Sequence, residues 1–355
     1  MQKEESFLKG ESPSVLVDSH GREVHYLRIS VTDRCNLCCR YCRDEKTPFM
    51  PHSDILTYEE IEDIIAVAVD MGVHKLRFTG GEPFARAGFL SFLRRIHERF
   101  PSVGLKLTSN GTLLGDALEE LKELGVAVNL SLDSLDRERF AAVTGRDMLP
   151  VVQENMRRML EMGIPLKINA VAMRGVNDGE LYDLASLAMG WPVDVRFIEF
   201  MPMGEDTIWN DSLFWSAADI LAAVREHWTL EPNIVRRKGR EQELHSGAEE
   251  LGPARLWKLR DAEGRQSKGS FGLITSVTQS FCQSCNRLRL TAEGHLRTCL
   301  YDDREYPLRD ALRSEGPEAV RRIMLEAVKN KPVGAELLSR RHGAVASRRM
   351  SAIGG

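Results

Sequence analysis

The sequence lacks any apolar run long enough to cross a lipid bilayer. Its first residues, Met-Gln-Lys-Glu-Glu-Ser, also lack the apolar region of a signal peptide. There is no excess of positive charge, because 48 Lys and Arg residues are outnumbered by 52 Asp and Glu residues, giving a net charge of -4. Such a chain has little general affinity for nucleic acid or membrane surfaces. We therefore expect a cytoplasmic protein with neither of these partners.

Cysteine is also scarce, and its seven residues are not spread along the chain as a disulfide framework would be. They form two groups, one near each end of the chain. This distribution is typical of metal ligation in a reducing compartment. The length of 355 residues exceeds what one hydrophobic core usually supports, so we expect a main domain followed by a second module.

The first cysteine group lies in the stretch Asp33-Arg-Cys-Asn-Leu-Cys-Cys-Arg-Tyr-Cys42. Cys35, Cys39 and Cys42 have the spacing C-x3-C-x2-C, which lets a short loop place three thiolates around one face of a four-iron cluster. The fourth iron then stays open and can chelate an amine and a carboxylate, which S-adenosylmethionine (SAM) offers together. Cys38 also pairs with Cys35 as C-x2-C, so zinc is an alternative, although zinc ribbons usually separate their two cysteine pairs by a longer span.

Short apolar segments alternate with amphipathic ones along the first 200 residues. The segment 25–31 alternates as a strand does and ends at the cysteine loop, and Thr57 with Glu60 forms a capping box for a helix that ends near Asp70. Further strands are expected at 74–79, 103–109, 126–132, 165–172 and 194–200, with helices at 88–100, 116–124, 150–162 and 179–189. Six such units predict a parallel sheet with outer helices, either an open doubly wound sheet or a partial TIM-like barrel.

Polar motifs follow the expected strands at their carboxyl ends, where barrel enzymes carry their chemistry. Thr79-Gly-Gly-Glu-Pro83 resembles the GGEP motif of radical SAM enzymes, which implies that its backbone and carboxylate hold the SAM amino group. Glycines let a backbone approach a ligand closely, although a Gly-Gly turn is also ordinary at a strand end. The other motifs are Thr108-Ser-Asn-Gly111, Ser131-Leu-Asp-Ser134, Lys167-Ile-Asn169 and Phe200-Met-Pro-Met203. Each alone is explained by a helix cap or turn, but together they can bind ribose hydroxyls, a carboxylate and phosphate.

The second cysteine group follows an expected helix at 216–227 and an extended charged region that reaches about residue 268. It has the spacing C-x2-C-x13-C and consists of Cys282, Cys285 and Cys299. Arg287 and Arg289 are expected on one face of a strand within it. A zinc knuckle would need a fourth ligand such as His295. The spacing therefore favours a second iron-sulfur cluster with an open iron over a zinc site.

Together these motifs resemble those of the MoaA-type GTP 3′,8-cyclases, radical SAM enzymes of molybdenum cofactor biosynthesis. The resemblance runs from about residue 20 to the last residue. Its motifs are Asp33-Arg-Cys-Asn36, Thr79-Gly-Gly-Glu-Pro83, Ser131-Leu-Asp-Ser-Leu135, Phe197-Ile-Glu-Phe-Met-Pro202, Cys285-Asn-Arg-Leu-Arg-Leu-Thr291 and Gly354-Gly355. The departure is Cys38, where the family usually has another residue. The resemblance implies an α/β fold, a partial (βα)6 TIM-like barrel of radical SAM type, with a C-terminal module that carries a second Fe-S cluster.

The implied activity is that of a lyase that converts GTP into (8S)-3′,8-cyclo-7,8-dihydroguanosine 5′-triphosphate, using two 4Fe-4S clusters and SAM. A 5′-deoxyadenosyl radical takes the 3′ hydrogen of the ribose, and the carbon radical closes on C8 of the guanine. The implied cluster ligands are Cys35, Cys39 and Cys42, and Cys282, Cys285 and Cys299. The implied SAM contacts are Tyr41, Gly81, Ser131 and Met201. The implied GTP contacts are Arg28, Arg77, Thr108, Lys167, Arg287, Leu288 and Arg289. Implied catalytic residues are Arg28, Arg77, Lys167, Gly354 and Gly355.

The implied organisation is a lead-in segment 1–24, a barrel 25–205, an auxiliary-cluster module 206–345 and an active-site tail 346–355. The implied partners are a reductant such as flavodoxin or ferredoxin and, downstream, cyclic pyranopterin monophosphate synthase; the chain would be a monomer or homodimer. Two alternatives stay open. One is a radical SAM enzyme with an auxiliary cluster that acts on a peptide, and such enzymes commonly bear further cysteines. The other is a zinc-binding structural module, which predicts zinc and no iron.

Overall fold

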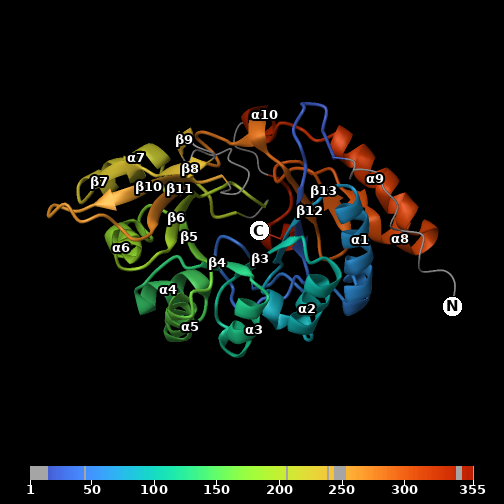
Figure 1. The fold of residues 1–355 in the computed structure, drawn as a ribbon, viewed down its shortest axis with the longest axis horizontal. Coiled ribbons are helices and arrows are strands. Elements are labelled where there is room, and N and C mark those ends of the chain that lie inside the picture. Colours follow the sequence, from blue (N-terminus) through green and yellow to red (C-terminus); the bar gives the residue numbers. More distant parts are fainter. Residues whose placement is uncertain are drawn as a thin grey trace.

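The computed structural model describes residues 15–43, 45–204, 207–237, 240–243, 253–340 and 346–354. Across these residues a 12-stranded sheet curves into an arch, with helices along its outer side and the C-terminal end of the chain on the inner side (Figure 1). The part of the chain that the structure describes has no helix that is both long and apolar enough to span a membrane. The concave side of the sheet faces the C-terminal end of the chain, and the helices do not cover it (Figure 1). We therefore expect the functional site on this side.

The central strands run parallel and neighbour one another in chain order. They are β1 (Tyr26–Ser30), β2 (Lys75–Thr79), β3 (Gly104–Ser109), β4 (Ala127–Ser131), β5 (Leu166–Ala172) and β6 (Asp194–Glu199). The connecting helices are α1 (Tyr58–Asp70), α2 (Phe89–Arg99), α3 (Leu118–Glu123), α4 (Arg137–Thr144), α5 (Leu149–Glu161) and α6 (Leu181–Gly190). The expected alternation of strands and helices is confirmed, and α4 is the one helix among these that the sequence analysis did not expect.

Local sequence signals explain where these helices begin. At α1 the Thr57 hydroxyl accepts from the amide of Glu60 (3.2 Å), and the Glu60 carboxylate accepts from the amide of Thr57 (2.8 Å), which confirms the capping box. At the unexpected α4 the carboxylate of Asp136 accepts from the amide of Arg139 (2.8 Å). An Asp in this position stabilises a helix start by about 1 kcal/mol, so this residue was the missed signal for α4.

The C-terminal part of the chain extends the same sheet at both edges. Strand β11 (Ser270–Ile274) pairs parallel with β6, and β12 (Arg287–Leu290) pairs parallel with β1. Beyond them lie β13 (His295–Arg297) and β14 (Tyr306–Pro307) on one side, and β10 (Arg255–Arg260) and β7 (Thr229–Pro232) on the other. The C-terminal cysteine loop therefore belongs to the sheet that carries the first one.

The remaining elements lie outside these strands. They are α7 (Ala217–Arg225), the strand pair β8 (Ile234–Arg237) and β9 (Arg240–Glu243), α8 (Leu308–Glu315), α9 (Pro317–Lys329), α10 (Gly334–Arg340) and α11 (Met350–Ile353). Helices α8 and α9 pack beside α1 (Figure 1). The region before residue 268, expected to be extended, contains β7 to β10 in its described parts.

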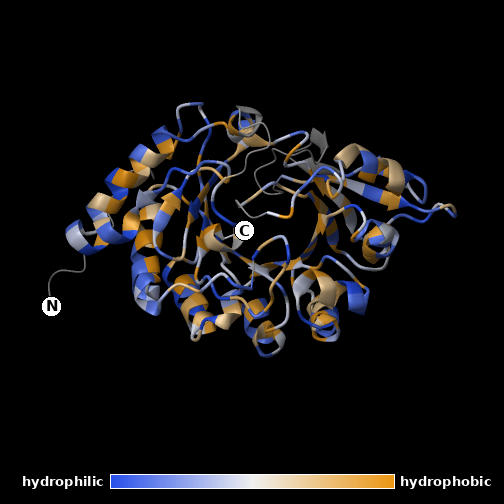
Figure 2. Cartoon of the chain, turned by 180° about the vertical axis from the view of Figure 1, so that it is seen from behind, coloured by the Kyte–Doolittle hydropathy of each residue, from blue (hydrophilic) through white to orange (hydrophobic). Residues whose placement is uncertain are grey.

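Side chains alternate along each central strand between an apolar outer face and a polar concave face. Leu27, Leu76 and Phe78 are fully buried beneath the helices, and burial of each such side chain stabilises the fold by about 1.5–3 kcal/mol. The outer helices carry both apolar and polar residues, as amphipathic helices do (Figure 2). The intervening residues of β1 and β2, such as Arg28 and Arg77, lie on the other face of the sheet. The alternation thus gathers polar residues on the concave side.

Candidate active site

The first cysteine loop follows β1. Hydrogen bonds within the loop and from Asn110 hold its backbone and one of its sulfur atoms. The Cys42 amide donates to the Cys39 carbonyl (2.8 Å), and the Leu37 amide and the Asn110 side chain donate to the Cys35 sulfur (3.5 and 3.6 Å). Burial raises the pKa of the Cys35 and Cys39 thiols, and that of Cys42 to about 12. Three thiolates held together in such surroundings need a cationic centre between them, so the loop fits a metal cluster.

The separation of the sulfur atoms distinguishes a cluster from a single zinc ion. A tetrahedral zinc site with Zn–S bonds of about 2.3 Å brings its sulfurs to about 3.8 Å from one another. Among the described residues, only one group of three potential ligands has its ligand atoms within 4.8 Å of one another, and it contains no cysteine. In this structure neither cysteine triplet brings its three sulfur atoms as close together as one zinc ion would require, and the expectation of four-iron clusters rests on the spacing of the cysteines along the chain.

Cys38 is anchored separately from the other cysteines of the loop. Its amide donates to the carbonyl of Thr144 at the end of α4 (2.8 Å), and its thiol donates to the carbonyl of Arg43 (3.5 Å). A Cβ on Gly145 would lie 3.3 Å from the Cys38 Cβ, so this stretch is tightly packed. A cavity of about 380 Å³ opens here, lined on one side by Cys38, Tyr41 and Cys42.

The Gly-Gly of the second strand end packs against the cysteine loop. A Cβ on Gly80 would lie 2.4 Å from the carbonyl oxygen of Thr32, and one on Gly81 would lie 2.2 Å from that of Arg34. The Gly81 amide donates to the Thr32 carbonyl and the Glu82 amide to the Arg34 carbonyl, both at 2.8 Å. The contact between these two loops therefore requires both glycines, a reason that the sequence analysis did not give, and the predicted contact of Gly81 with SAM stays a prediction.

Two buried carboxylates tie the strand ends together. Glu82 accepts from the Ser109 hydroxyl (3.0 Å) and the Asn110 amide (2.8 Å), and burial raises its pKa to about 7. The carboxylate expected to hold the SAM amino group is thus engaged within the protein. Asp133 accepts from the Tyr41 hydroxyl (2.6 Å), and burial raises its pKa to about 6. Tyr41 is therefore held by the loop that follows β4, in which Asp133 lies two residues after Ser131, a residue predicted to contact SAM.

The second cysteine loop leads into β12, and Cys299 follows β13. A Cβ on Gly334 would lie 2.7 Å from the sulfur of Cys299 and 3.4 Å from that of Cys282. Only glycine lets the start of α10 approach these two sulfurs so closely. His295, considered as a fourth zinc ligand, instead contacts carboxylates, which lie 3.1 and 3.2 Å from its Nδ1.

A buried cation supports the second loop. The ammonium of Lys331, only 1% exposed, donates to the Cys285 sulfur (3.6 Å), to the Arg287 carbonyl (2.8 Å) and to the Thr298 carbonyl. Burial alone would raise the pKa of the Cys285 thiol, but Lys331 and Arg287 lower it below its usual value. Arg22 braces the loop by donating to the Cys282 carbonyl (2.7 Å). Lys331 and Arg22 were both missed, because neither lies near a cysteine in the sequence.

A group of cations lines the concave face on adjacent strands. The register places Arg28 of β1 directly beside Arg77 of β2 and Arg289 of β12, and Arg77 beside Lys106 of β3. Like charges opposite one another destabilise a sheet, so this arrangement costs stability unless an anion binds there. Arg77 also donates to Thr108 (3.2 Å), which brings that predicted contact into the group.

The electrostatics of this group fit a polyanionic ligand. Burial, together with neighbouring cations, lowers the pKa of Arg289 to about 10 and that of Lys167 to about 8. Within the described part of the chain, the buried Nε atoms of Arg196 and Arg287 have no hydrogen-bond partner. An anion with several oxygens would satisfy such donors and offset the mutual repulsion.

Sequence reasoning missed several members of the group. Tyr26 accepts from the Nε of Arg77; burial raises the pKa of Tyr26, but Arg77, Arg28 and Arg287 lower it to about 7. The cations that were missed are Lys75, Lys106 and Arg196. The signal would have been that Lys75 and Lys106 stand two residues from a predicted contact on the same strand. Arg196 lies opposite Asn169, a member of the polar motif that begins at Lys167. Leu288, by contrast, is fully buried on the opposite face of β12, so it can reach this side only through its backbone.

The end of the chain enters the same face. The carbonyl of Gly354 accepts from the Nη1 of Arg289 (2.9 Å). A Cβ on Gly354 would lie 3.0 Å from the Cγ2 of Thr79 and 3.1 Å from the Cβ of Ser30, and its φ of 67° favours glycine. The tail is thus adjacent to the ends of β1 and β2. Gly355 lies outside the described residues.

Comparisons with known proteins agree with this site. Residues 29–188 match the model of the radical SAM superfamily, and residues 193–337 match that of Molybdenum Cofactor Synthesis C. The GTP 3′,8-cyclase of Syntrophomonas wolfei subsp. wolfei is 40% identical over 323 residues, which cover 89% of this chain and 93% of that protein. The chain belongs to the GTP 3′,8-cyclase family. The family member from Heliobacterium modesticaldum is also 40% identical, over 96% of this chain and all of that protein.

The fold comparison is consistent with this family. Streptococcus suis SuiB bound to S-adenosylmethionine matches with a TM-score of 0.59 and 15% identity, over 90% of this chain and 69% of that one. At this identity the likeness shows the fold alone. Radical SAM enzymes use a 4Fe-4S cluster and SAM, and the GTP 3′,8-cyclases carry a second cluster. The predicted family, fold class and cofactors are confirmed, while the residue assignments and domain boundaries stay predictions.

Proposed function

We propose that this chain is a radical SAM GTP 3′,8-cyclase that converts GTP into (8S)-3′,8-cyclo-7,8-dihydroguanosine 5′-triphosphate, the first step of molybdenum cofactor biosynthesis. The observation that carries the proposal is the cation group on strands that connect the two cysteine loops. Strand β1 leads into the first loop, the second loop leads into β12, and the two strands are paired from Tyr26 with Arg287 onwards. A nucleoside triphosphate has the charge that this group requires.

Each part of the site then has a role. Cys35, Cys39 and Cys42 would hold the cluster that binds SAM, and Cys282, Cys285 and Cys299 would hold the second one. When bound, the first cluster and SAM supply the radical that removes the 3′ hydrogen of the ribose. Arg28, Arg77, Arg287, Arg289 and Lys167 bind the triphosphate, as forked guanidinium bonds to phosphate do. Holding both reacting carbons in place lowers the entropic part of the barrier to ring closure.

The partners beyond GTP are part of the same proposal. The reaction needs an electron donor, for which flavodoxin or ferredoxin is suitable, and its product is the substrate of cyclic pyranopterin monophosphate synthase. The cytoplasm is the proposed location because clusters and donors of this kind require reducing conditions.

The decisive experiment is anaerobic reconstitution followed by turnover with GTP, SAM and dithionite. We expect roughly eight irons per chain, no stoichiometric zinc, and equal amounts of 5′-deoxyadenosine and cyclised GTP. With GTP deuterated at C3′, the label should appear in 5′-deoxyadenosine. Iron without any GTP conversion would support the enzyme acting on a peptide, and zinc without iron would support the structural module.

The phosphate-binding role of Arg287 can be tested separately from the clusters. Arg287→Ala should weaken GTP binding by about 1.5–3 kcal/mol, the contribution of a charged hydrogen bond, and leave the iron content unchanged. Arg287 is a cleaner choice than Arg289, which also holds Gly354. Calorimetric titration with GTP measures the effect, with Arg157→Ala on the exposed face of α5 as the control. Normal GTP affinity together with a lost second cluster would instead make Arg287 structural.

A further inference from the structure

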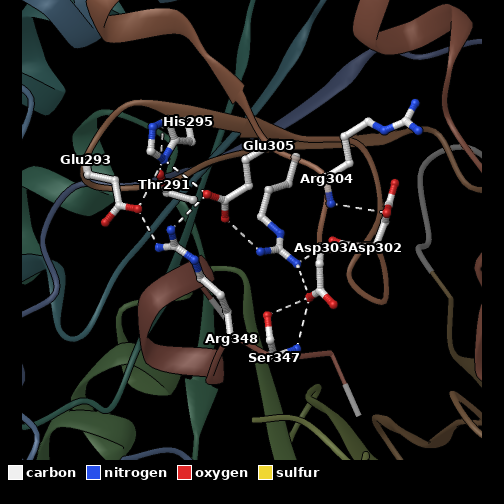
Figure 3. Close-up of polar contacts among 10 residues, drawn as sticks. Thr291, Glu293, His295, Asp302, Asp303, Arg304, Glu305, Ser347 and Arg348 are labelled. Atoms are coloured by element: carbon white, nitrogen blue, oxygen red, sulfur yellow. Dashed lines mark hydrogen bonds and ion pairs between the residues drawn. The ribbon is translucent and has the colours of Figure 1, made fainter. Parts of the chain in front are cut away.

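The segment that ends in Gly354 is also held at a second place, beside strand β13, whose Arg297 pairs with Arg289 of the cation group. Ser347 and Arg348 lie against the stretch between β12 and β14, where Glu293 of the β12–β13 turn and Asp303 and Glu305 of the loop before β14 point toward them (Figure 3). We call these three residues the carboxylate group. None of the contacts takes part in the function proposed above.

Both residues of the tail are bound by charged hydrogen bonds. The guanidinium of Arg348 bridges two carboxylates, donating through Nη1 to Glu293 and through Nη2 to Glu305 (2.8 Å). The amide and the hydroxyl of Ser347 both donate to Asp303 (2.9 and 3.0 Å). Two adjacent residues thus engage all three carboxylates, and this fixes the direction in which the chain continues towards α11.

The carboxylate group is itself rigidly supported. Glu305 also accepts from the Nη1 of Arg297 (2.8 Å), a guanidinium with no exposed surface, and Arg297 donates to the carbonyl of Asp302 as well. His295 lies between Glu293 and Glu305, whose carboxylates raise its pKa to about 9. At neutral pH, Arg297, His295 and Arg348 therefore balance the three carboxylates. Loss of Arg348 would leave an excess of negative charge in this half-buried place.

A metal ion is the other possible occupant, because Glu293, His295 and Glu305 bring three ligand atoms within 4.8 Å of one another. However, the two carboxylates already accept charged hydrogen bonds from Arg348, and Glu305 accepts one from Arg297. A cation would have to displace the guanidinium of Arg348. The contacts therefore favour a tether over a metal site.

The segment after Arg348 connects this tether to the concave face. It contains the short helix α11, in which Ile353 is fully buried against Met203 and Tyr301, and then Gly354, whose carbonyl accepts from Arg289. The stretch between β12 and β14, which supplies the carboxylate group, also contains Cys299. The contacts of Ser347 and Arg348 therefore fix the position of the tail relative to the part of the chain that carries Cys299.

We propose that Glu293, Asp303 and Glu305 act, through Arg348 and Ser347, as an electrostatic clamp that positions Gly354 in the substrate site. Arg348 is a positioning residue, which acts on the reaction through Gly354 rather than by touching GTP. The inference depends on the proposed function only for its activity readout, because the position of the tail can be measured without turnover.

The test compares Arg348→Met, which removes the charge and retains the stem, with Arg157→Met. Arg157 also bridges two carboxylates, Glu154 and Glu161, but on the exposed face of α5. Hydrogen–deuterium exchange of the reconstituted enzyme should be roughly 10-fold faster or more in peptides covering residues 346–354 of Arg348→Met, the factor expected from losing a charged hydrogen bond. It should be unchanged in Arg157→Met, and Arg348→Lys should lie between the wild type and Arg348→Met.

Turnover provides the second readout. In Arg348→Met the ratio of 5′-deoxyadenosine to cyclised GTP should rise, with iron content unchanged, and Glu293→Gln should add little to Arg348→Met because both break the same contact. Unchanged tail exchange in Arg348→Met would overturn the clamp. Faster exchange with an unchanged product ratio would overturn its positioning role, and loss of iron would show that the network holds the stretch that contains Cys299 instead. If the chain does not cyclise GTP at all, the exchange result still decides whether the clamp exists.

Discussion

Removal of Gly354 and Gly355 will lower the rate of GTP cyclisation on the order of 100-fold, the cost of losing alignment at a reacting centre, and leave iron content and SAM binding unchanged. The reason is the position of Gly354, whose carbonyl accepts from Arg289 at the ends of β1 and β2. Without the tail, Arg289 loses this orienting contact. Cyclised GTP and 5′-deoxyadenosine should be quantified side by side under reducing conditions.

Gly354→Ala gives a more selective version of this experiment. The new methyl group would meet Thr79 and Ser30 at 3.0 and 3.1 Å, at a φ of 67° that disfavours any side chain, so it should displace the tail without shortening it. Gly163→Ala is the matched control, because its φ of 71° is similar but a Cβ there would contact nothing within 4 Å. A truncated enzyme that forms product at the full rate would mean that the tail has no role in the reaction.

Cys39→Ala will abolish SAM cleavage and reduce the iron content from about eight to about four atoms per chain, whereas Cys38→Ala will retain both clusters. The two neighbours differ in their surroundings. Cys39 packs against the main hydrophobic core, while Cys38 is held by the Thr144 carbonyl and donates to the carbonyl of Arg43. Cys38 cannot replace Cys39 without moving the backbone of the loop by one residue.

Iron and sulfide analysis with an absorption spectrum would measure this difference, and 5′-deoxyadenosine formation would report on the first cluster alone. Cys282→Ala serves as the control, because it should lose the second cluster and retain the first. Equal iron loss in Cys38→Ala and Cys39→Ala would reject the assignment of Cys38 as a bystander.

Several features were predictable because they depend on residues close together in the chain. The two cysteine spacings, the Thr57 capping box and the alternating strands each involve a few neighbouring residues, whose geometry follows from local backbone rules. The start of helix α4 also depends on neighbouring residues. Its signal is the N-cap residue Asp136, which the sequence analysis overlooked because the helix has only 8 residues. For the glycines of Thr79-Gly-Gly-Glu-Pro83 the structure supplies a packing reason that the sequence analysis did not give, and the ligand contact stays a prediction.

By itself, the sequence determined which residues can ligate metal and which family the chain resembles, because these depend on residue type and spacing. Only the tertiary structure decided that β12 pairs with β1 across more than 250 residues, and that Arg28, Arg77 and Arg289 therefore stand side by side. It also brought Lys331 to Cys285 and Arg348 to Glu293. Strand partners and register are chosen by burial of the apolar face over the whole sheet, and no local pattern encodes that choice.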